Sequence, residues 1–261
     1  MRICSRKCKH NWVNDSAPDA PLYMMNGPRQ IRSPKSLLGL FRFSMPSFLV
    51  GLVLLIVAAP FAQRTQVGQL LESGVLTSML ITAVFAVGRR RRVLWLAILM
   101  MLPTVAGKWL NHFWPDVVSP LWFLSCILIF ILFILIQLLH FILIAPRVNG
   151  DILCAGIASY LLLGLLWAFA YMLVAQLVPG AFFFDGRIEA AKAMTSFTSV
   201  YFSFITLTTV GYGDITPVAG VARMLAAMEA MTGTLFVAIL ISRLVSMYSK
   251  HPPAGGTTDK Q

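Results

Sequence analysis

Long runs of apolar residues constrain the fold of this chain more than any other feature. The hydrocarbon core of a bilayer is about 30 Å thick, so a helix that spans it needs about 20 mostly apolar residues. Only 12% of the 261 residues are charged, about half the share usual in a soluble domain. The sequence therefore predicts an all-α membrane protein with six transmembrane helices. The six predicted spans are Met45–Ala62, Leu70–Val87, Val93–Leu110, Val117–Ile144, Ile152–Val178 and Val218–Met247.

The distribution of basic residues predicts how the chain is oriented. A net charge of +11 would suggest nucleic acid as a partner in a soluble domain. Here the basic residues cluster in short segments between apolar runs, a pattern that marks the cytoplasmic side of a membrane. If six spans alternate, the basic segments share one side, so we expect both termini in the cytoplasm, a location in the cell's plasma (inner) membrane and no nucleic-acid partner. The densest cluster is Arg89, Arg90, Arg91 and Arg92, which either fixes orientation or binds anionic lipid headgroups.

The cysteines give no sign of a disulfide framework. Cys4 and Cys8 lie in a basic tail, whereas Cys126 and Cys154 lie inside apolar runs. Cys4, Cys8 and His10 have ligand chemistry for a metal but lack a fourth donor, so reduced cytosolic thiols are the favoured interpretation. We expect no cofactor.

An unusual segment separates the fifth and sixth spans. Its first part, "PGAFFFDGRIEAA", is predicted to be a surface loop, and its second part, Met194–Leu207, is apolar and hydroxyl-rich but too short to cross a bilayer. Such a segment can enter the membrane and turn back. Irregular backbone at that depth persists only when it is buried in protein or lines a wet cavity. Residues 208–214 should therefore face something polar.

The stretch "TLTTVGYGD", residues 206–214, resembles the selectivity filter of potassium channels. The span, re-entrant helix, filter and span order over 152–247 is similar as well. The resemblance implies K⁺ ligands at the carbonyls of Thr209, Val210, Gly211 and Tyr212, with the Thr209 hydroxyl, because carbonyl rings replace the hydration shell of the ion. Gly211 and Gly213 supply backbone angles that other residues resist. One motif per chain implies a fourfold homotetramer that conducts K⁺ passively.

Neighbouring residues are expected to support this filter. The ring of Tyr212 should point away from the ions and brace against Tyr201 and Phe202. Tyr201 is also positioned to hydrogen-bond Asp214 at the outer mouth.

The re-entrant helix, predicted over Thr195–Leu207, should aim its partly negative C-terminal end at the pore cavity and favour a cation there. The hydroxyls of Thr206 and Thr208 either tie this helix to the filter or bond back to their own helix.

The sixth span is predicted to line the inner pore. Gly233 lies where the inner helix of similar channels carries a hinge glycine, although a small residue for close helix packing is the alternative. Helical spacing from this glycine puts Thr234, Val237, Ile241 and Val245 on one face, an apolar wall able to close by dewetting.

Glu229 is an acid well inside the sixth predicted span, and a buried acid of this kind is a functional candidate by default. It should hydrogen-bond Ser199 or Ser203 behind the filter, either as a group that titrates with the gate or as a protonated structural partner. Steep voltage sensing needs several basic residues in one span, because one charge gains about 2.3 kcal/mol per 100 mV. The fourth span offers only His140, so we expect weak or no voltage dependence.

Four parts are expected in the chain. These are a basic cytoplasmic tail (1–44), a four-helix membrane domain (45–145), a pore domain (146–248) and a short cytoplasmic tail (249–261). Alternatives to a K⁺ channel are a nonselective cation channel, a nonconducting sensor or scaffold, and an intramembrane aspartyl protease with the Gly-x-Gly-Asp signature of Gly211–Asp214. The protease needs a second membrane-embedded aspartate, and the sequence offers none, so we expect neither an enzyme nor a small-molecule substrate.

Overall fold

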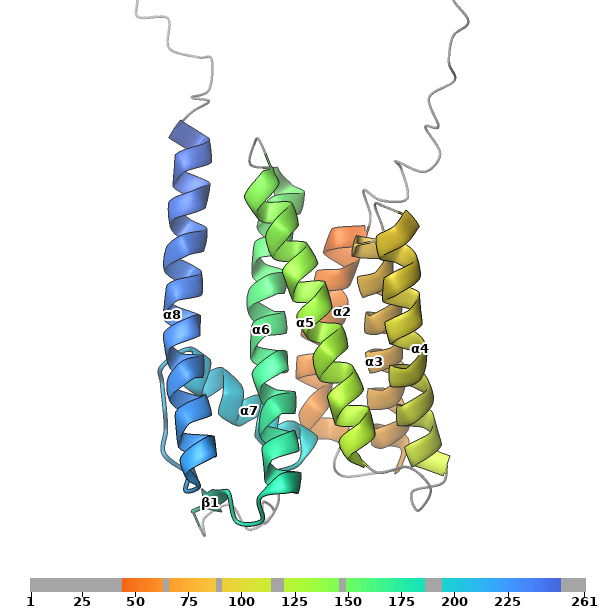
Figure 1. Ribbon diagram of the computed structural model, residues 1–261, viewed down its shortest axis with the longest axis vertical. Helices are drawn as coiled ribbons and strands as arrows, with labels where there is room; N and C mark the ends of the chain where they lie inside the picture. The colour runs from red at the N-terminus through yellow and green to blue at the C-terminus, as the bar shows by residue number, and fades with distance from the viewer. Residues whose placement is uncertain are drawn as a thin grey trace, which may run out of the picture. The chain divides into compact units, whose positions relative to one another are not determined.

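The computed structural model describes residues 44–62, 66–87, 91–113, 120–145, 149–185 and 194–249. Outside this part of the chain lie Arg89 and Arg90, the segment with Cys4, Cys8 and His10, and the C-terminal tail from residue 250. The described residues form seven helices and two short strands (Figure 1). The helices are α2 (Ser44–Ala62), α3 (Gln66–Val87), α4 (Arg91–Phe113), α5 (Pro120–Ile144), α6 (Gly150–Leu177), α7 (Ser196–Leu207) and α8 (Gly220–Ser249), and the strands are β1 (Phe182–Phe184) and β2 (Ile215–Pro217).

Each predicted span coincides with one long helix. The ends agree within a few residues, as for the predicted span Val117–Ile144 and the observed helix α5. Four of the helices, α4, α5, α6 and α8, are long and apolar enough to cross a bilayer, whereas the apolar parts of α2 and α3 are shorter. The chain is therefore a largely helical, multi-pass membrane protein.

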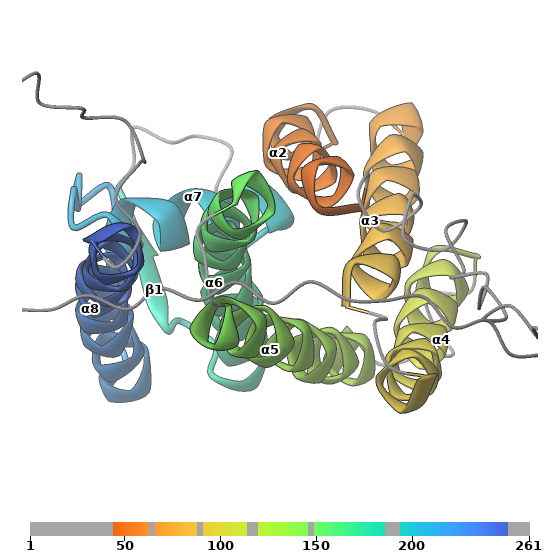
Figure 2. The same cartoon turned by 90° about the horizontal axis from the view of Figure 1, so that it is seen from above.

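The first four helices pack as a chain of neighbours. Helix α2 contacts α3, α3 contacts α4, and α4 contacts α5, while α6 packs against both α2 and α5 (Figure 2). The buried residues of this core are almost all aliphatic or phenylalanine, and Phe48, Leu80, Ile134 and Leu162 are fully enclosed. The helix α6 thus joins the first four helices to the rest of the chain.

The short helix α7 lies between α6 and α8, and it also contacts α2 (Figure 1). Helix α8 contacts only α6, α7 and β2 substantially among the described elements. It therefore leaves large apolar side chains such as Met231, Leu235, Ile239 and Ile241 more than half exposed.

A pair of antiparallel strands corrects the prediction for "PGAFFFDGRIEAA". Phe182–Phe184 is not a surface loop but pairs with Ile215–Pro217, with Phe182 opposite Pro217 and Phe184 opposite Ile215. Phe182 is buried, as is Ile215. The strands form because the segment after α6 and the segment after the glycine-rich stretch satisfy each other's backbone hydrogen bonds, which the hydropathy of either segment does not reveal.

Candidate ion-conduction site

The start of α7 is fixed by its own threonines. Thr195 is the N-cap, and its side chain accepts a hydrogen bond from the backbone N–H of Thr198 (3.4 Å), while the Thr198 hydroxyl accepts one from the N–H of Thr195 (2.7 Å). This reciprocal capping box satisfies donors that a helix N-terminus otherwise leaves unpaired. The predicted re-entrant helix therefore begins within one residue of its expected start.

The other end of α7 stops at Leu207, and the chain then folds back on it. The Thr206 hydroxyl donates to the Phe202 carbonyl (2.8 Å) and the Thr208 hydroxyl to the Phe204 carbonyl (2.6 Å). Both hydroxyls therefore bond back to their own helix, which is the second of the two predicted alternatives. A tie from these hydroxyls to the glycine-rich stretch is not what the structure contains.

The backbone of residues 209–213 alternates in conformation. The angle φ is positive at Thr209 (61°), Gly211 (51°) and Gly213 (80°) but not at Val210 or Tyr212. Alternation of this kind turns successive N–H groups to one side. The two glycines accept positive φ without steric cost, as predicted. The sequence did not point to Thr209, where a left-handed conformation costs about 1–2 kcal/mol.

Three N–H groups of this stretch donate to carbonyls of α7. Thr209 donates to the Thr206 carbonyl (2.9 Å), and Val210 and Gly211 both donate to the Ile205 carbonyl (2.9 and 3.1 Å). Within the part of the chain that the structure describes, no hydrogen bond reaches the carbonyl oxygens of residues 209–212. Four consecutive backbone oxygens thus accept no hydrogen bond among the described residues.

Asp214 anchors the end of this stretch. Its carboxylate accepts hydrogen bonds from the Tyr201 hydroxyl (2.7 Å) and from the N–H of Ile215 (3.0 Å), and its carbonyl accepts one from the N–H of Asp185 (2.9 Å). The contact between Tyr201 and Asp214 is the one expected from the sequence. The strand pair is therefore fastened to the C-terminal end of the glycine-rich stretch.

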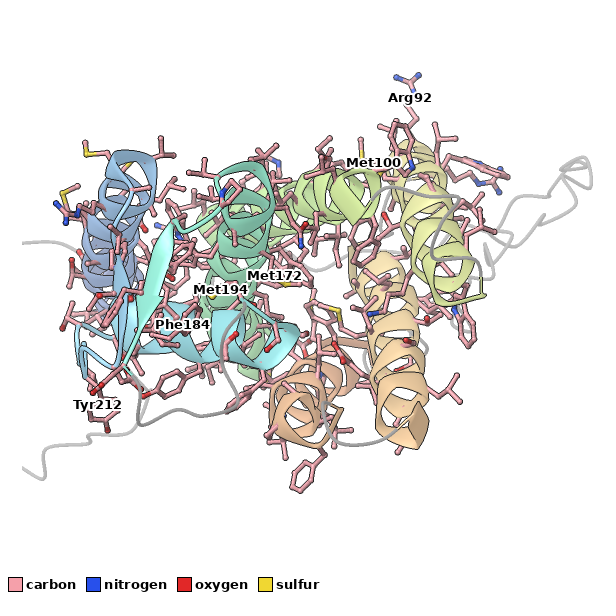
Figure 3. All side chains as sticks on the ribbon, turned by 90° about the horizontal axis from the view of Figure 1, so that it is seen from below. Arg92, Met100, Met172, Phe184, Met194 and Tyr212 are labelled. Carbon is pink, nitrogen blue, oxygen red and sulfur yellow. The ribbon has the colours of Figure 1, made fainter. Side chains whose placement is uncertain are left out.

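Within one chain, Phe202 does not take part in the expected aromatic brace of Tyr212. Phe202 is buried against Tyr171 and Phe182, with ring centroids 4.9 and 5.6 Å away, whereas the Tyr212 ring is 72% exposed. Figure 3 shows Tyr212 projecting away from the helices. Within one chain Tyr212 therefore does not brace against Phe202. Sequence reasoning missed Tyr171 and Phe182 here, and the one available signal was that three consecutive phenylalanines are unusual in a surface loop.

Glu229 is fully buried where α6, α7 and α8 meet. The hydroxyls of Tyr171 and Ser203 each lie 2.5 Å from one of its carboxyl oxygens. Of the two serines considered from the sequence, Ser203 is the partner, because Ser199 donates to the Ser196 carbonyl instead (3.0 Å). The Tyr171 contact was missed because it comes from a helix 58 residues away in sequence.

Two glycines allow the helices around this site to approach closely. A β-carbon at Gly233 would collide with the Leu207 carbonyl oxygen at the end of α7, and one at Gly164 would lie 2.7 Å from the Phe204 ring. For Gly233 the geometry favours the predicted alternative, a small residue for close packing. The residues after it, Thr234, Val237, Ile241 and Val245, are all exposed within one chain.

Arg91 and Arg92, the described part of the basic cluster, occupy the first turn of α4 and are exposed, with Arg92 directed away from the helices (Figure 3). Among the described residues, no group of three or more His, Cys, Asp or Glu side chains is placed to hold a metal ion.

Residues 159–250, which contain α7, the glycine-rich stretch and α8, match a family model described as "Ion channel". The chain is also 37% identical over 101 residues to Protein LctB of Bacillus caldotenax, an alignment that covers 38% of this chain and 74% of that protein. The chain belongs to the ion channel family. This confirms the resemblance to potassium channels, and a channel family indicates a non-enzymatic protein.

Two further relatives of this ion channel carry potassium in their names. It is 34% identical over 64 residues to Two-pore potassium channel 4 of Arabidopsis thaliana, covering 24% of this chain and 22% of the relative. It is 27% identical over 66 residues to a candidate potassium channel protein of Rhodopseudomonas palustris, covering 25% and 16%. The chain thus spans less than a quarter of either relative's length. No solved structure matches it.

Proposed function

We propose that this ion channel is a homotetramer that conducts K⁺ selectively and passively. The observation that carries the proposal is that the four consecutive carbonyl oxygens of residues 209–212 accept no hydrogen bond within the described part of the chain, while three N–H groups of the same stretch donate to α7. A cation sheds its water only when other oxygens replace the shell, and rings of carbonyls do this in potassium-selective filters.

One chain supplies a quarter of each such ring. Four copies around an axis would complete the rings formed by Thr209, Val210, Gly211 and Tyr212, and would bury apolar surface of α8 that one chain leaves exposed. In that assembly, the α8 face with Val237, Ile241 and Val245 lines the inner pore. The C-terminal end of each α7 would direct its partial negative charge at the cavity.

The remaining helices complete a six-span membrane topology in this proposal. Helices α2 and α3 also span the bilayer, which puts both termini in the cytoplasm and the protein in the plasma membrane. The helix α5 carries His140 as its single basic side chain, so gating depends weakly or not at all on voltage. Arg91 and Arg92 contact membrane lipids, with anionic headgroups as the preferred partners.

Flux into liposomes tests the proposal with a matched pair of glycine variants. Gly211 and Gly180 both have positive φ, and a methyl group added at either position would meet open space, so Gly211→Ala and Gly180→Ala carry a similar backbone cost of about 1–2 kcal/mol. Gly180 lies in the turn before β1, outside the proposed filter. We expect Rb⁺ and K⁺ uptake with Na⁺ excluded in the wild type, retention of uptake in Gly180→Ala and its loss in Gly211→Ala.

The alternatives give different results in the same assay. Uptake of Na⁺ together with K⁺ identifies a nonselective cation channel. Absence of any ion uptake by a folded, reconstituted tetramer favours a nonconducting sensor or scaffold. Equal uptake by the two glycine variants would show that residues 209–212 are not the conduction path.

A further inference from the structure

Glu229 joins three helices through a chain of hydroxyl groups. The Tyr171 hydroxyl of α6 lies 2.5 Å from Oε2, and the Ser203 hydroxyl of α7 lies 2.5 Å from Oε1. The same Ser203 oxygen lies 2.7 Å from the carbonyl oxygen of Gly164 in α6. These three contacts are all short enough to be hydrogen bonds, and Glu229 has no exposed surface.

Counting hydrogens shows what this arrangement requires. A serine hydroxyl has one hydrogen and a tyrosine hydroxyl has one, while the Gly164 carbonyl has none. If Glu229 is ionised, two hydrogens must serve three short contacts, and one pair of oxygens is left with only lone pairs facing each other. If Glu229 carries a proton on Oε1, it donates to Ser203, Ser203 donates to Gly164, and Tyr171 donates to Oε2. Each contact then has one hydrogen.

The surroundings agree with the hydrogen count. No Lys, Arg or His side chain contacts Glu229 among the described residues, and the titratable groups that face it are two phenols of α6, Tyr171 and Tyr160. Helix α7 contributes Ser203, and α8 contributes Glu229 alone. A buried carboxylate without a cationic partner is costly in a protein interior, and more so within a membrane.

We infer that Glu229 is a neutral carboxylic acid that donates a hydrogen bond to Ser203 and so holds the outer, pore and inner helices in one fixed arrangement behind the filter. Glu229 is a positioning residue, because it acts through Ser203 and α7. Within one chain it forms no hydrogen bond with residues 209–213. The inferred protonation state of Glu229 does not depend on whether the protein conducts ions. An effect of Glu229 on the filter, by contrast, rests on the proposed function.

Infrared spectroscopy of the wild-type protein tests the proton directly. The other glutamates of the sequence are Glu72 and Glu189, so a Glu72→Gln, Glu189→Gln background with ¹³C-labelled glutamate leaves one labelled side chain. We expect the C=O band of a protonated carboxyl group that shifts with the label. A labelled band at the carboxylate position instead would overturn the inference, whether or not the protein conducts ions.

Substitutions test the positioning role. In Glu229→Gln the amide N–H₂ can replace the donor to Ser203 and its oxygen can still accept from Tyr171, so we expect the heat resistance of the tetramer and K⁺ selectivity to stay at the wild-type level. Glu229→Ala removes the acceptor of the Tyr171 hydroxyl and breaks the link between α8 and Ser203, whose hydroxyl keeps only the Gly164 carbonyl, and we expect loss of both properties. If Glu229→Gln fails as Glu229→Ala does, an ionised carboxylate was required and the inference is wrong.

Two serines of α7 provide a matched control. Ser203 and Ser199 are both fully buried one turn apart, but Ser199 bonds only to the Ser196 carbonyl within its own helix. Ser203→Ala should lower heat resistance and K⁺ selectivity, while Ser199→Ala should change neither. Equal effects of the two substitutions would contradict the link through Ser203.

Discussion

The substitution Gly233→Ala distinguishes two roles for this residue in the middle of α8: close packing against α7, or a hinge at which α8 bends. The new β-carbon would overlap the Leu207 carbonyl oxygen and lie 2.9 Å from Leu207 Cδ1, whereas carbon–oxygen contacts are normally about 3.3 Å or longer. The obstructing oxygen belongs to the backbone at the end of α7, so it cannot rotate away as a side chain would. Helices α7 and α8 must therefore separate.

The change in folding free energy caused by Gly233→Ala is the sum of two opposed contributions. Overpacking of this kind costs about 1–3 kcal/mol, and alanine favours a helix over glycine by about 1 kcal/mol. The net loss reaches about 2 kcal/mol per chain, which is more than a tenfold change in a folding equilibrium because about 1.4 kcal/mol is tenfold. We expect Gly233→Ala to lower the temperature at which half of the detergent-solubilised protein stays folded.

Gly156 is the matched control for this prediction. It also faces a neighbouring helix, but a β-carbon there would meet the flexible end of Leu240 at 3.2 Å instead of backbone. Gly156→Ala should therefore be neutral or slightly stabilising. The packing argument would be refuted, and a hinge favoured, if Gly233→Ala resisted heat at least as well as Gly156→Ala but showed reduced ion flux.

Three further substitutions test separate contacts. Tyr201→Phe removes a hydrogen bond to the Asp214 carboxylate, worth about 1.5–3 kcal/mol when the acceptor is charged. We expect this variant to select K⁺ over Na⁺ less strongly in liposome flux. Unchanged selectivity would contradict a supporting role for Tyr201. Gly164→Ala would place a β-carbon 2.7 Å from Phe204, so heat resistance should fall and should recover in the double variant with Phe204→Leu. Arg243→Gln removes the guanidinium that donates to the carbonyls of Leu143, in the last turn of α5, and of Ala145, just after it, at 2.7 and 3.3 Å. The loss of about 0.3–1 kcal/mol should lower heat resistance and leave selectivity unchanged.

The helices could be predicted closely because a bilayer imposes a length on every span. Hydropathy alone located α5 and α8 within a few residues, and the apolar, hydroxyl-rich run before the glycine-rich stretch located α7. The alternating backbone was also anticipated at Gly211 and Gly213, since few other residues accept positive φ. These features depend on local sequence or on the surrounding solvent, so one segment carries the whole signal.

The features that sequence reasoning missed depend on contacts between distant segments. Phe182–Phe184 looked like a loop because a strand of three residues has no periodicity of its own, and its partner lies beyond the glycine-rich stretch. Glu229 was matched to Ser199 or Ser203 but not to Tyr171, because helical position predicts a neighbour on the adjoining helix only once that helix has been placed. Thr209 adopts positive φ against its own preference, under the constraint of its hydrogen bond to Thr206.

Hydrogen bonds from two side chains connect the first four helices to the half of the chain that carries the glycine-rich stretch. The Ser196 hydroxyl, in the first turn of α7, donates to the Glu72 carboxylate of α3 (2.7 Å), and Arg243 near the end of α8 donates to carbonyls at the end of α5. Glu72 places an acidic group at the partly positive start of α7, and Arg243 places a basic group at the partly negative end of α5, so each charge interacts favourably with a helix dipole. Both contacts form within one chain, and α6 packs against α2 and α5 of that same chain. A displacement of α3 or α5 would therefore act on α7 and α8 of the same chain.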